Sequence, residues 1–313
     1  PMYELLSAIA MGVLQGATEF LPISSSGHLR LAETLFALPK TDLLFDIILH
    51  VGTLVAVCAV YREALQQIIA DLWSAAAALL RTRSLAQALR WEGARLALLI
   101  VVATVPTGIL GIVLDKLVDG PWLSLGHVGG LLIINGLILL LSGWATPEPT
   151  TGQDDRSGPD LDTASMASSV RPGATSSSTD PDPNLSLWRI NLPKALLIGV
   201  AQGLAVLPGI SRSGLTITVC LMLGVEREQA ARFSFLLSIP AILGALVLKF
   251  DPEVIINAPP AQWLRFGLGA LSAALVGYIC LVLLIKLLKE ARFHHFAWYC
   301  FAVGALAIGR TLM

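Results

Sequence analysis

Six apolar segments, each of about the length that crosses a bilayer, constrain this chain more than any other feature. A membrane-spanning helix needs roughly 20 mostly apolar residues. The segments cover residues 43–61, 95–114, 123–144, 233–250, 264–285 and 296–313. Only 14% of the residues are charged, against about 25% in a typical soluble domain. The sequence therefore predicts an all-α polytopic membrane protein with six transmembrane helices.

Four further apolar segments are only about half that length, and they come as two pairs. They cover residues 3–14, 29–38, 192–207 and 215–225, and each pair flanks a loop rich in Gly, Pro and Ser. In a membrane, irregular backbone is tolerated only where it is buried in protein or lines a water-filled cavity. The pattern predicts two re-entrant helical hairpins, at residues 3–38 and 192–225.

The two loops also resemble each other. "GVLQGATEFLPISSSGH" begins at Gly12 and "GVAQGLAVLPGISRSGL" begins at Gly199, an offset of 187 residues with eight identities in seventeen positions. Each hairpin precedes three spans, and because three is odd the second half enters the membrane from the opposite side. The sequence predicts an inverted-topology repeat, with halves 1–144 and 191–313 and a functional site near the middle of the membrane.

Loop charges predict the orientation. Basic residues concentrate in the connections 62–95 and 286–295, and basic loops favour the cytoplasmic side. Both termini and the mouth of the first hairpin are then expected outside. Residues 62–94 are partly amphipathic and are interpreted as a surface helix. Residues 145–190, rich in Ser, Thr, Asp, Pro and Gly, predict a flexible cytoplasmic loop.

Charge and cysteine content exclude several other functions. The net charge of −1 gives no electrostatic indication of a nucleic-acid partner. The four cysteines lie far apart inside apolar segments without a CxxC pair. We therefore expect buried thiols rather than a disulfide framework or a zinc site.

The polar loops predict an anion site. Both end where a short helix begins, and the N-terminus of a helix attracts anions through its unpaired N–H groups and its dipole. Arg212 lies in the second loop, and its planar guanidinium can bind two phosphate oxygens at once. A phosphate-bearing ligand is predicted, and anion binding without phosphate specificity stays open. The expected substrate-binding residues are Ser24, Ser26, Gly27, Ser211, Ser213 and Gly214.

The first loop carries reactive groups as well. Glu19, Ser25 and His28 supply a carboxylate, a hydroxyl and an imidazole, the groups used in nucleophile activation and proton transfer. Gln15, four residues before Glu19, faces the same side of a helix, so the two could hold a divalent cation or orient a water.

The two repeats divide these groups between them. At the positions of Glu19 and His28 the second repeat has Val206 and Leu215, and Arg212 takes the place of Ser25. Charged side chains within a membrane are costly and usually functional. A duplicated scaffold whose halves separate reactive groups from an anion clamp is typical of an active site.

Several polar residues remain open to two interpretations. Any of the loop serines could simply cap a helix, and His28 could be a structural hydrogen-bonding group. Asp46 and His50, four residues apart, either support the site from behind or form an interfacial pair. Four residues have no partner that spacing identifies: His127, Asn135, His294 and His295.

These motifs resemble those of the undecaprenyl-diphosphate phosphatases, the BacA-type bacterial family linked to bacitracin resistance. The resemblance lies in Gln15 and Glu19 followed by "PISSSGH", in "PGISRSG" from Pro208 to Gly214, and in "FDIILHVGTLVAV" and "RFSFLLSIPA". It implies hydrolysis of undecaprenyl diphosphate to the monophosphate, which recycles the lipid carrier for peptidoglycan synthesis. It also implies a divalent cation, Mg²⁺ or Ca²⁺, and a location in the bacterial plasma (inner) membrane with the site open to the outer, periplasmic side.

The mechanism that follows from the resemblance assigns four catalytic residues. Arg212 and both helix N-termini would hold the diphosphate, Ser25 would attack the terminal phosphorus, and Glu19 would act as base directly or through the metal. His28 would protonate the leaving oxygen or activate water. His28 as the nucleophile is the rival assignment.

Two other functions share parts of this pattern. A second class of lipid phosphatases needs a His and an Asp after its Arg, and the residues after Arg212, "SGLTITVCLML", contain neither. A transporter or flippase of a phosphorylated polyprenyl lipid would explain the repeat and Arg212 but gives Glu19, Ser25 and His28 less to do. Membrane lipid is an expected partner, and a homodimer is left open.

Overall fold

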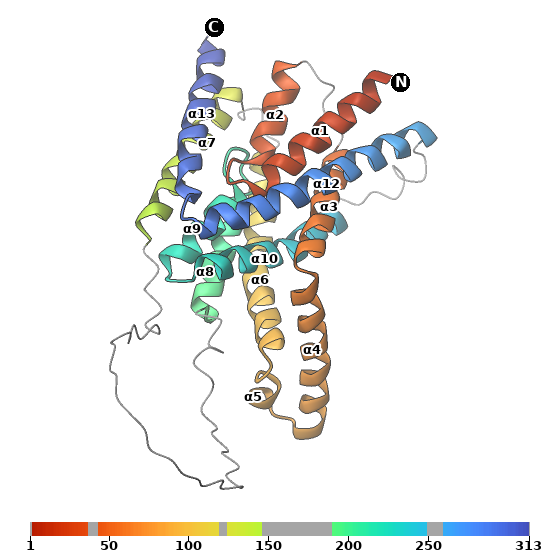
Figure 1. Ribbon diagram of the computed structural model, residues 1–313, viewed down its shortest axis with the longest axis vertical. Helices are drawn as coiled ribbons and strands as arrows, with labels where there is room; N and C mark the ends of the chain where they lie inside the picture. Colours follow the sequence, from red (N-terminus) through yellow and green to blue (C-terminus); the bar gives the residue numbers. More distant parts are fainter. Residues whose placement is uncertain (1, 37–42, 119–123, 146–189, 249–258, 313) are drawn as a thin grey trace, which may run out of the picture.

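The computed structural model describes residues 2–36, 43–118, 124–145, 190–248 and 259–312, and within these ranges every regular element is a helix (Figure 1). The first half contains α1 Met2–Phe20, α2 Ser25–Leu35, α3 Leu43–Val60, α4 Arg62–Thr82, α5 Leu85–Ala88, α6 Glu92–Val118 and α7 Leu125–Trp144. The second half contains α8 Leu192–Leu204, α9 Arg212–Met222, α10 Arg227–Leu248, α12 Pro260–Lys289, the 3₁₀ turn η2 Phe293–His295 and α13 Phe296–Leu312. The loop predicted at 145–190 lies outside the described residues except for its first and last.

Among the described residues, four helices are long and apolar enough to cross a membrane, namely α6, α7, α10 and α12. The pair α3 and α4 passes the same test together but is bent by 78° at Tyr61, so it provides a fifth span if it counts as one. Many apolar side chains on these helices face outward, such as Ile109 at 59% exposed and Ile279 at 65%. A bilayer removes the cost of exposing such surface to water. The prediction of a multi-pass helical membrane protein is confirmed.

The predicted boundaries of the short helices are wrong in both hairpins. In the second, α8 ends at Leu204 rather than at residue 207, and α9 begins at Arg212 rather than at residue 215. In the first, α1 does not end at residue 14 but continues to Phe20, and α2 begins at Ser25 rather than at residue 29. The apolar run ends at Gln15, but the helix goes on because the polar side chains beyond that point are buried with partners of their own. Ser25 and Ser26 accordingly lie in the first turn of α2, and Ser24 directly precedes it.

Each of the two hairpins packs along a helix from the other half of the chain. α1 lies beside α12, and α8 lies beside α6 (Figure 1). Both contacts depend on a glycine at the same position of the repeat. A Cβ on Gly12 would collide with the carbonyl oxygen of Gly269, and a Cβ on Gly199 would collide with that of Ala103. Close approach of small residues is a usual way for membrane helices to associate.

We expect the Gly12→Ala substitution to destabilise the protein by about 1–3 kcal/mol, because the added methyl group must push α1 away from α12. Thermal unfolding of the purified protein in detergent measures the effect. Gly130→Ala in α7 is the matched control, since its Cβ would meet no atom of the described residues within 4 Å. Equal unfolding temperatures for the two variants would contradict this packing.

Candidate active site

Each of the two polar loops ends in a serine that caps the following helix. Ser24 Oγ accepts a hydrogen bond from the backbone N–H of Gly27 at 3.3 Å and caps α2. Ser211 Oγ accepts from the N–H of Gly214 at 3.0 Å and caps α9. Serine is among the preferred N-cap residues. Both short helices therefore begin next to the loops, and their first turns carry the remaining polar residues of each motif.

The loops also bind each other directly. The N–H of Gly209 in the second loop donates to Ser24 Oγ at 3.0 Å, and Ser213 Oγ donates to the carbonyl of Phe20 at 2.9 Å. A Cβ on Gly27 would lie 3.3 Å from the Gly209 Cα, so the backbones nearly touch. Ser24 has a φ of 69°, which is costly for a residue other than glycine. This strained conformation keeps its hydroxyl between the two loops.

Glu19 is the centre of the polar cluster. Its Oε1 accepts from Nη2 of Arg212 at 2.6 Å, and its Oε2 accepts from Ser25 Oγ at 2.6 Å and from Gln15 Nε2 at 2.9 Å. The residue is only 7% exposed. A buried carboxylate is tolerated when it is paired and its lone pairs are bonded. The pairing with Arg212 joins the first hairpin to the second.

A cavity of about 210 Å³ opens beside this cluster. Its polar lining comprises Glu19, Ser24, Ser25, Ser26, His50, Ser211 and Arg212, and its apolar lining comprises Ala205, Val206, Ile210, Ala241, Ile242 and Ala245. Within the described ranges, the buried Nη1 of Arg212 and the buried Oε1 of Gln15 have no hydrogen-bond partner. The cavity thus offers a guanidinium N–H for an anion next to a hydroxyl that is already bonded to a carboxylate.

His50 faces the same cavity. Its Nδ1 donates to the backbone carbonyl of Asp46 at 2.8 Å, and its Nε2 lies 3.6 Å from Oε2 of Glu19. Because Nδ1 carries one proton, a second proton on Nε2 would complete an ion pair with the carboxylate. Asp46, four residues before His50, therefore orients the imidazole through its backbone carbonyl, and this orientation places Nε2 beside Glu19.

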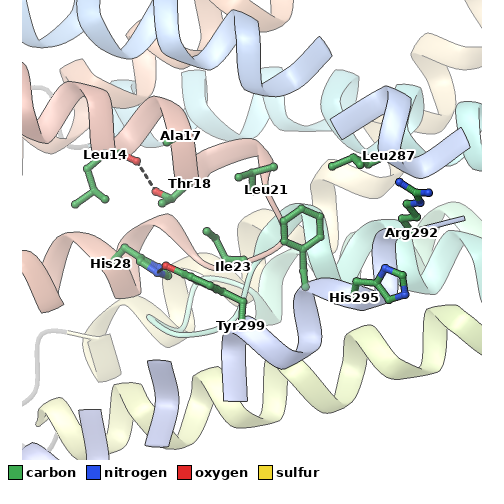
Figure 2. A pocket seen from close by; sticks show the side chains of 11 residues that line it. Leu14, Ala17, Thr18, Leu21, Ile23, His28, Leu287, Arg292, His295 and Tyr299 are labelled. Carbon is green, nitrogen blue, oxygen red and sulfur yellow. Dashed lines mark hydrogen bonds between the residues drawn. The ribbon is translucent and has the colours of Figure 1, made fainter. Parts of the chain in front are cut away.

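His28 faces away from the cavity that Glu19 and Ser25 share. Its Nδ1 lies 2.8 Å from the carbonyl oxygen of Ser24, its Nε2 lies 2.9 Å from the hydroxyl of Tyr299, and the two rings stack (Figure 2). Since a carbonyl only accepts, Nδ1 is the donor, and the neutral imidazole accepts from Tyr299 through Nε2. The His28 side chain lines a different, larger cavity on the other side of the first loop.

Asn135 in α7 binds both loops, and sequence reasoning identified no partner for it. Its Nδ2 donates to the carbonyl of Pro22 at 2.8 Å and to Sγ of Cys300 at 3.3 Å. Its Oδ1 accepts from the N–H of Ser211 at 2.9 Å. The residue is fully buried. A lone amide within an apolar span was the available signal, but spacing does not show which backbone groups it reaches.

The predicted residues therefore occupy three places. Those that line the Glu19 cavity are Glu19, Ser24, Ser25, Ser26, Ser211 and Arg212, joined there by His50. Gln15 lies behind Glu19 and donates a hydrogen bond to it. Gly27, Ser213 and Gly214 take part in the hydrogen bonds within and between the two loops. His28 lines the second cavity, on the other side of the first loop. No group of three or more His, Cys, Asp or Glu side chains suited to a metal occurs in the described part of the chain. Oxygen ligands for a hard cation are available from Gln15 and Glu19.

The helices and the site define a class: multi-pass membrane proteins in which an arginine, a carboxylate and a serine hydroxyl meet between two helix N-termini. The family model described as bacitracin resistance protein BacA matches residues 8–306. The chain belongs to this family.

Curated relatives agree with that assignment over almost their whole length. A protein of Desulfosudis oleivorans is 40% identical over 97% of this chain and 98% of its own. A protein of Desulforapulum autotrophicum is 38% identical over 97% of this chain and 98% of its own. A protein of Geobacter sulfurreducens is 34% identical over 97% of both chains. Each of these three relatives is named undecaprenyl-diphosphatase.

Asn135→Ala should lower the free energy of unfolding by about 1–3 kcal/mol, because the Ser211 N–H and the Pro22 carbonyl lose a buried partner. Thermal unfolding in detergent checks this. Ser142→Ala is the control on the same helix, since in the described part of the chain the Ser142 hydroxyl bonds only the carbonyl of Leu139 one turn away. An Asn135 variant as stable as the Ser142 variant would show that α7 does not hold the loops.

Proposed function

We propose that this chain hydrolyses undecaprenyl diphosphate to undecaprenyl phosphate and inorganic phosphate, and so recycles the lipid carrier for peptidoglycan synthesis. The observation that carries the proposal is the hydrogen bond from Ser25 Oγ to Glu19 Oε2, made next to the guanidinium of Arg212. A nucleophile, its base and a phosphate ligand are thereby adjacent. The names of the curated relatives support the same reaction.

Substrate binding would use the groups that the site leaves unpaired. Nη1 of Arg212 is buried without a partner in the described chain, and it can take a phosphate oxygen while Nη2 keeps Glu19 in place. The N-termini of α2 and α9 add N–H groups and the positive ends of two helix dipoles. The diphosphate would thus be held by the positive charge of Arg212, from the second repeat, and by backbone N–H groups from both repeats.

Ser25 is then placed to attack the terminal phosphorus. As its Oγ–P bond forms, its proton passes to Glu19 Oε2, 2.6 Å away, and the bond from phosphorus to the bridging oxygen breaks. The lipid monophosphate leaves with that oxygen, and phosphate stays on Ser25. Phosphoryl transfer depends mainly on positioning and charge stabilisation. Because the His28 imidazole faces the other cavity, the geometry favours Ser25 over His28 as nucleophile.

Hydrolysis of the phosphoserine needs a base for water and returns the site to its starting state. Water attacks phosphorus, one of its protons passes to a base, and Ser25 Oγ leaves with the proton from Glu19. The base then gives its proton to the departing phosphate. His50 lines the cavity with Nε2 toward Glu19, so it takes the place that the sequence-based mechanism gave to His28.

A divalent cation, Mg²⁺ or Ca²⁺, fits the oxygen donors on one side of the site. The unpartnered Oε1 of Gln15 and the carboxylate of Glu19 are the residues that would hold it. When bound, the ion would neutralise charge on the diphosphate.

The membrane arrangement is part of the proposal. Equivalent serines cap α2 and α9, equivalent glycines pack α1 on α12 and α8 on α6, and each hairpin contacts the opposite half. These correspondences support an inverted repeat of two re-entrant hairpins, and we keep for it the six spans that the apolar segments predict. We place the chain in the bacterial plasma membrane with basic loops inside, both termini outside and the site open to the outer side. Transport of the lipid would leave the Ser25–Glu19 bond without a role.

Phosphate release from undecaprenyl diphosphate by the purified protein tests the function. Ser25→Ala should lower kcat by about 10³-fold or more, because the nucleophile is lost, and Arg212→Lys by about 10²-fold, because the planar fork is lost. Thr34→Ala, which removes a hydroxyl from the same helix α2 outside the cavity, should keep full activity. A folded wild type that binds the lipid and releases no phosphate would exclude the phosphatase.

Chelation tests the cation. EDTA should abolish phosphate release, and excess Mg²⁺ or Ca²⁺ should restore it. In the absence of substrate, the restoring ion should raise the unfolding temperature of the wild type but not that of Glu19→Gln. If the ion stabilises both proteins equally, Glu19 is not its ligand.

A further inference from the structure

A cavity larger than the Glu19 cavity lies on the other side of the first loop, between α1, the α12–α13 connection and α13. Its volume is about 560 Å³. Most of its lining is apolar, from Leu14, Ala17, Leu21, Ile23, Leu287 and Phe296. Thr18 also lines it, but the Thr18 hydroxyl donates to the carbonyl of Leu14 at 2.7 Å, which leaves its methyl group for the wall (Figure 2).

The two ends of this cavity differ in chemistry. At one end, His28 and Tyr299 satisfy each other through their 2.9 Å hydrogen bond, so this end offers mainly the surfaces of the stacked rings. At the other end lie Arg292 and His295 (Figure 2). An occupant must therefore be long and apolar, with one anionic end. A sugar or a nucleotide would leave its polar groups without partners along the walls.

The charge at the Arg292 end remains available to a ligand. Arg292 Nη1 lies 3.3 Å from Oε2 of Glu290, but the two side chains are 62% and 38% exposed. An ion pair with that exposure contributes little. Lys286 and Lys289 occupy the last turn of α12 next to this end, and Lys289 is paired with Glu228 at 2.9 Å. The connection is one of the two whose basic residues predict the cytoplasmic side.

We propose that this cavity is a binding site for an anionic phospholipid of the bilayer, with the phosphate on Arg292 and His295 and one acyl chain extending toward His28 and Tyr299. Basic pockets between membrane helices are a known way to bind anionic headgroups. A bilayer phospholipid is the occupant that the position favours, because the charged end is exposed and lies in the basic connection between two apolar helices. The site is separate from hydrolysis and does not depend on it.

Occupancy would support the first loop from behind. An acyl chain would contact Leu21 and Ile23, which lie in that loop, and His28, which holds the carbonyl of Ser24 at 2.8 Å. Ser25 follows Ser24 directly. The lipid would therefore pack against the backs of the residues that present the hydroxyl to the other cavity.

Native mass spectrometry of the purified full chain, titrated with phosphatidylglycerol or with phosphatidylcholine of the same acyl chains, tests the site without substrate. The wild type should bind phosphatidylglycerol about 10-fold more tightly. Arg292→Ala combined with His295→Ala should remove this preference, and Arg292→Lys should retain part of it. Arg310→Ala, an exposed charge at the far end of α13, is the matched control and should keep the preference.

A second pair of variants tests the chain-binding wall. Ala17→Phe should fill the groove and weaken phosphatidylglycerol binding about 10-fold, whereas Ala305→Phe, on an exposed position of α13 outside the lining, should not. Each variant must elute as a single species with wild-type helix content. Equal binding of the two lipids by the wild type, or unchanged binding by the Arg292/His295 variant or by Ala17→Phe, would overturn the site. A wild type without phosphatase activity that still prefers phosphatidylglycerol would reject only the proposed function.

Discussion

The buried ion pair between Glu19 and Arg212 is the interaction on which the arrangement of the two loops depends. The two residues are 193 positions apart, and they meet at 2.6 Å with most of both side chains buried. Neither charge is tolerable there alone, since removing one partner of a buried pair leaves an uncompensated charge. The two loops must therefore be fixed relative to each other. Bonds to backbone groups do this, through the Ser24 hydroxyl, the Ser213 hydroxyl and the Asn135 amide.

Sequence patterns predicted the parts of the site that depend on local order. The repeated loop motif, with serines just before each short helix, predicted that two helix N-termini would meet, and α2 and α9 begin beside loops that touch. Apolar run length predicted the helices but misplaced the end of α1, because Gln15 and Glu19 are polar yet buried. An apolar segment ends at the first polar residues of the sequence, whereas a helix can continue through polar residues whose side chains have buried partners.

Contacts between distant segments could not be predicted in the same way. Spacing along α2 places His28 one turn from Ser25, but it does not show which of the two cavities the imidazole faces. That orientation is fixed by the hydrogen bond to Tyr299, which lies 271 positions away in the sequence. Asn135 was recognised only as a lone amide in an apolar helix, and its partners Pro22 and Ser211 lie on different loops. The predicted catalytic roles stay predictions, although Glu19, Ser25 and Arg212 line one cavity.

The asymmetry between the repeats explains why one scaffold needs two different loops. Val206 occupies the position in the second repeat that Glu19 has in the first, and both line the same cavity of about 210 Å³. A second carboxylate at Val206 would repel the first and compete for the same guanidinium. With an apolar residue there, Arg212 is oriented by one carboxylate, and its Nη1 has no partner among the described residues and can bind a ligand. The two loops thus share a serine-capped helix start, and the residues in which they differ place one carboxylate and one guanidinium at the same cavity.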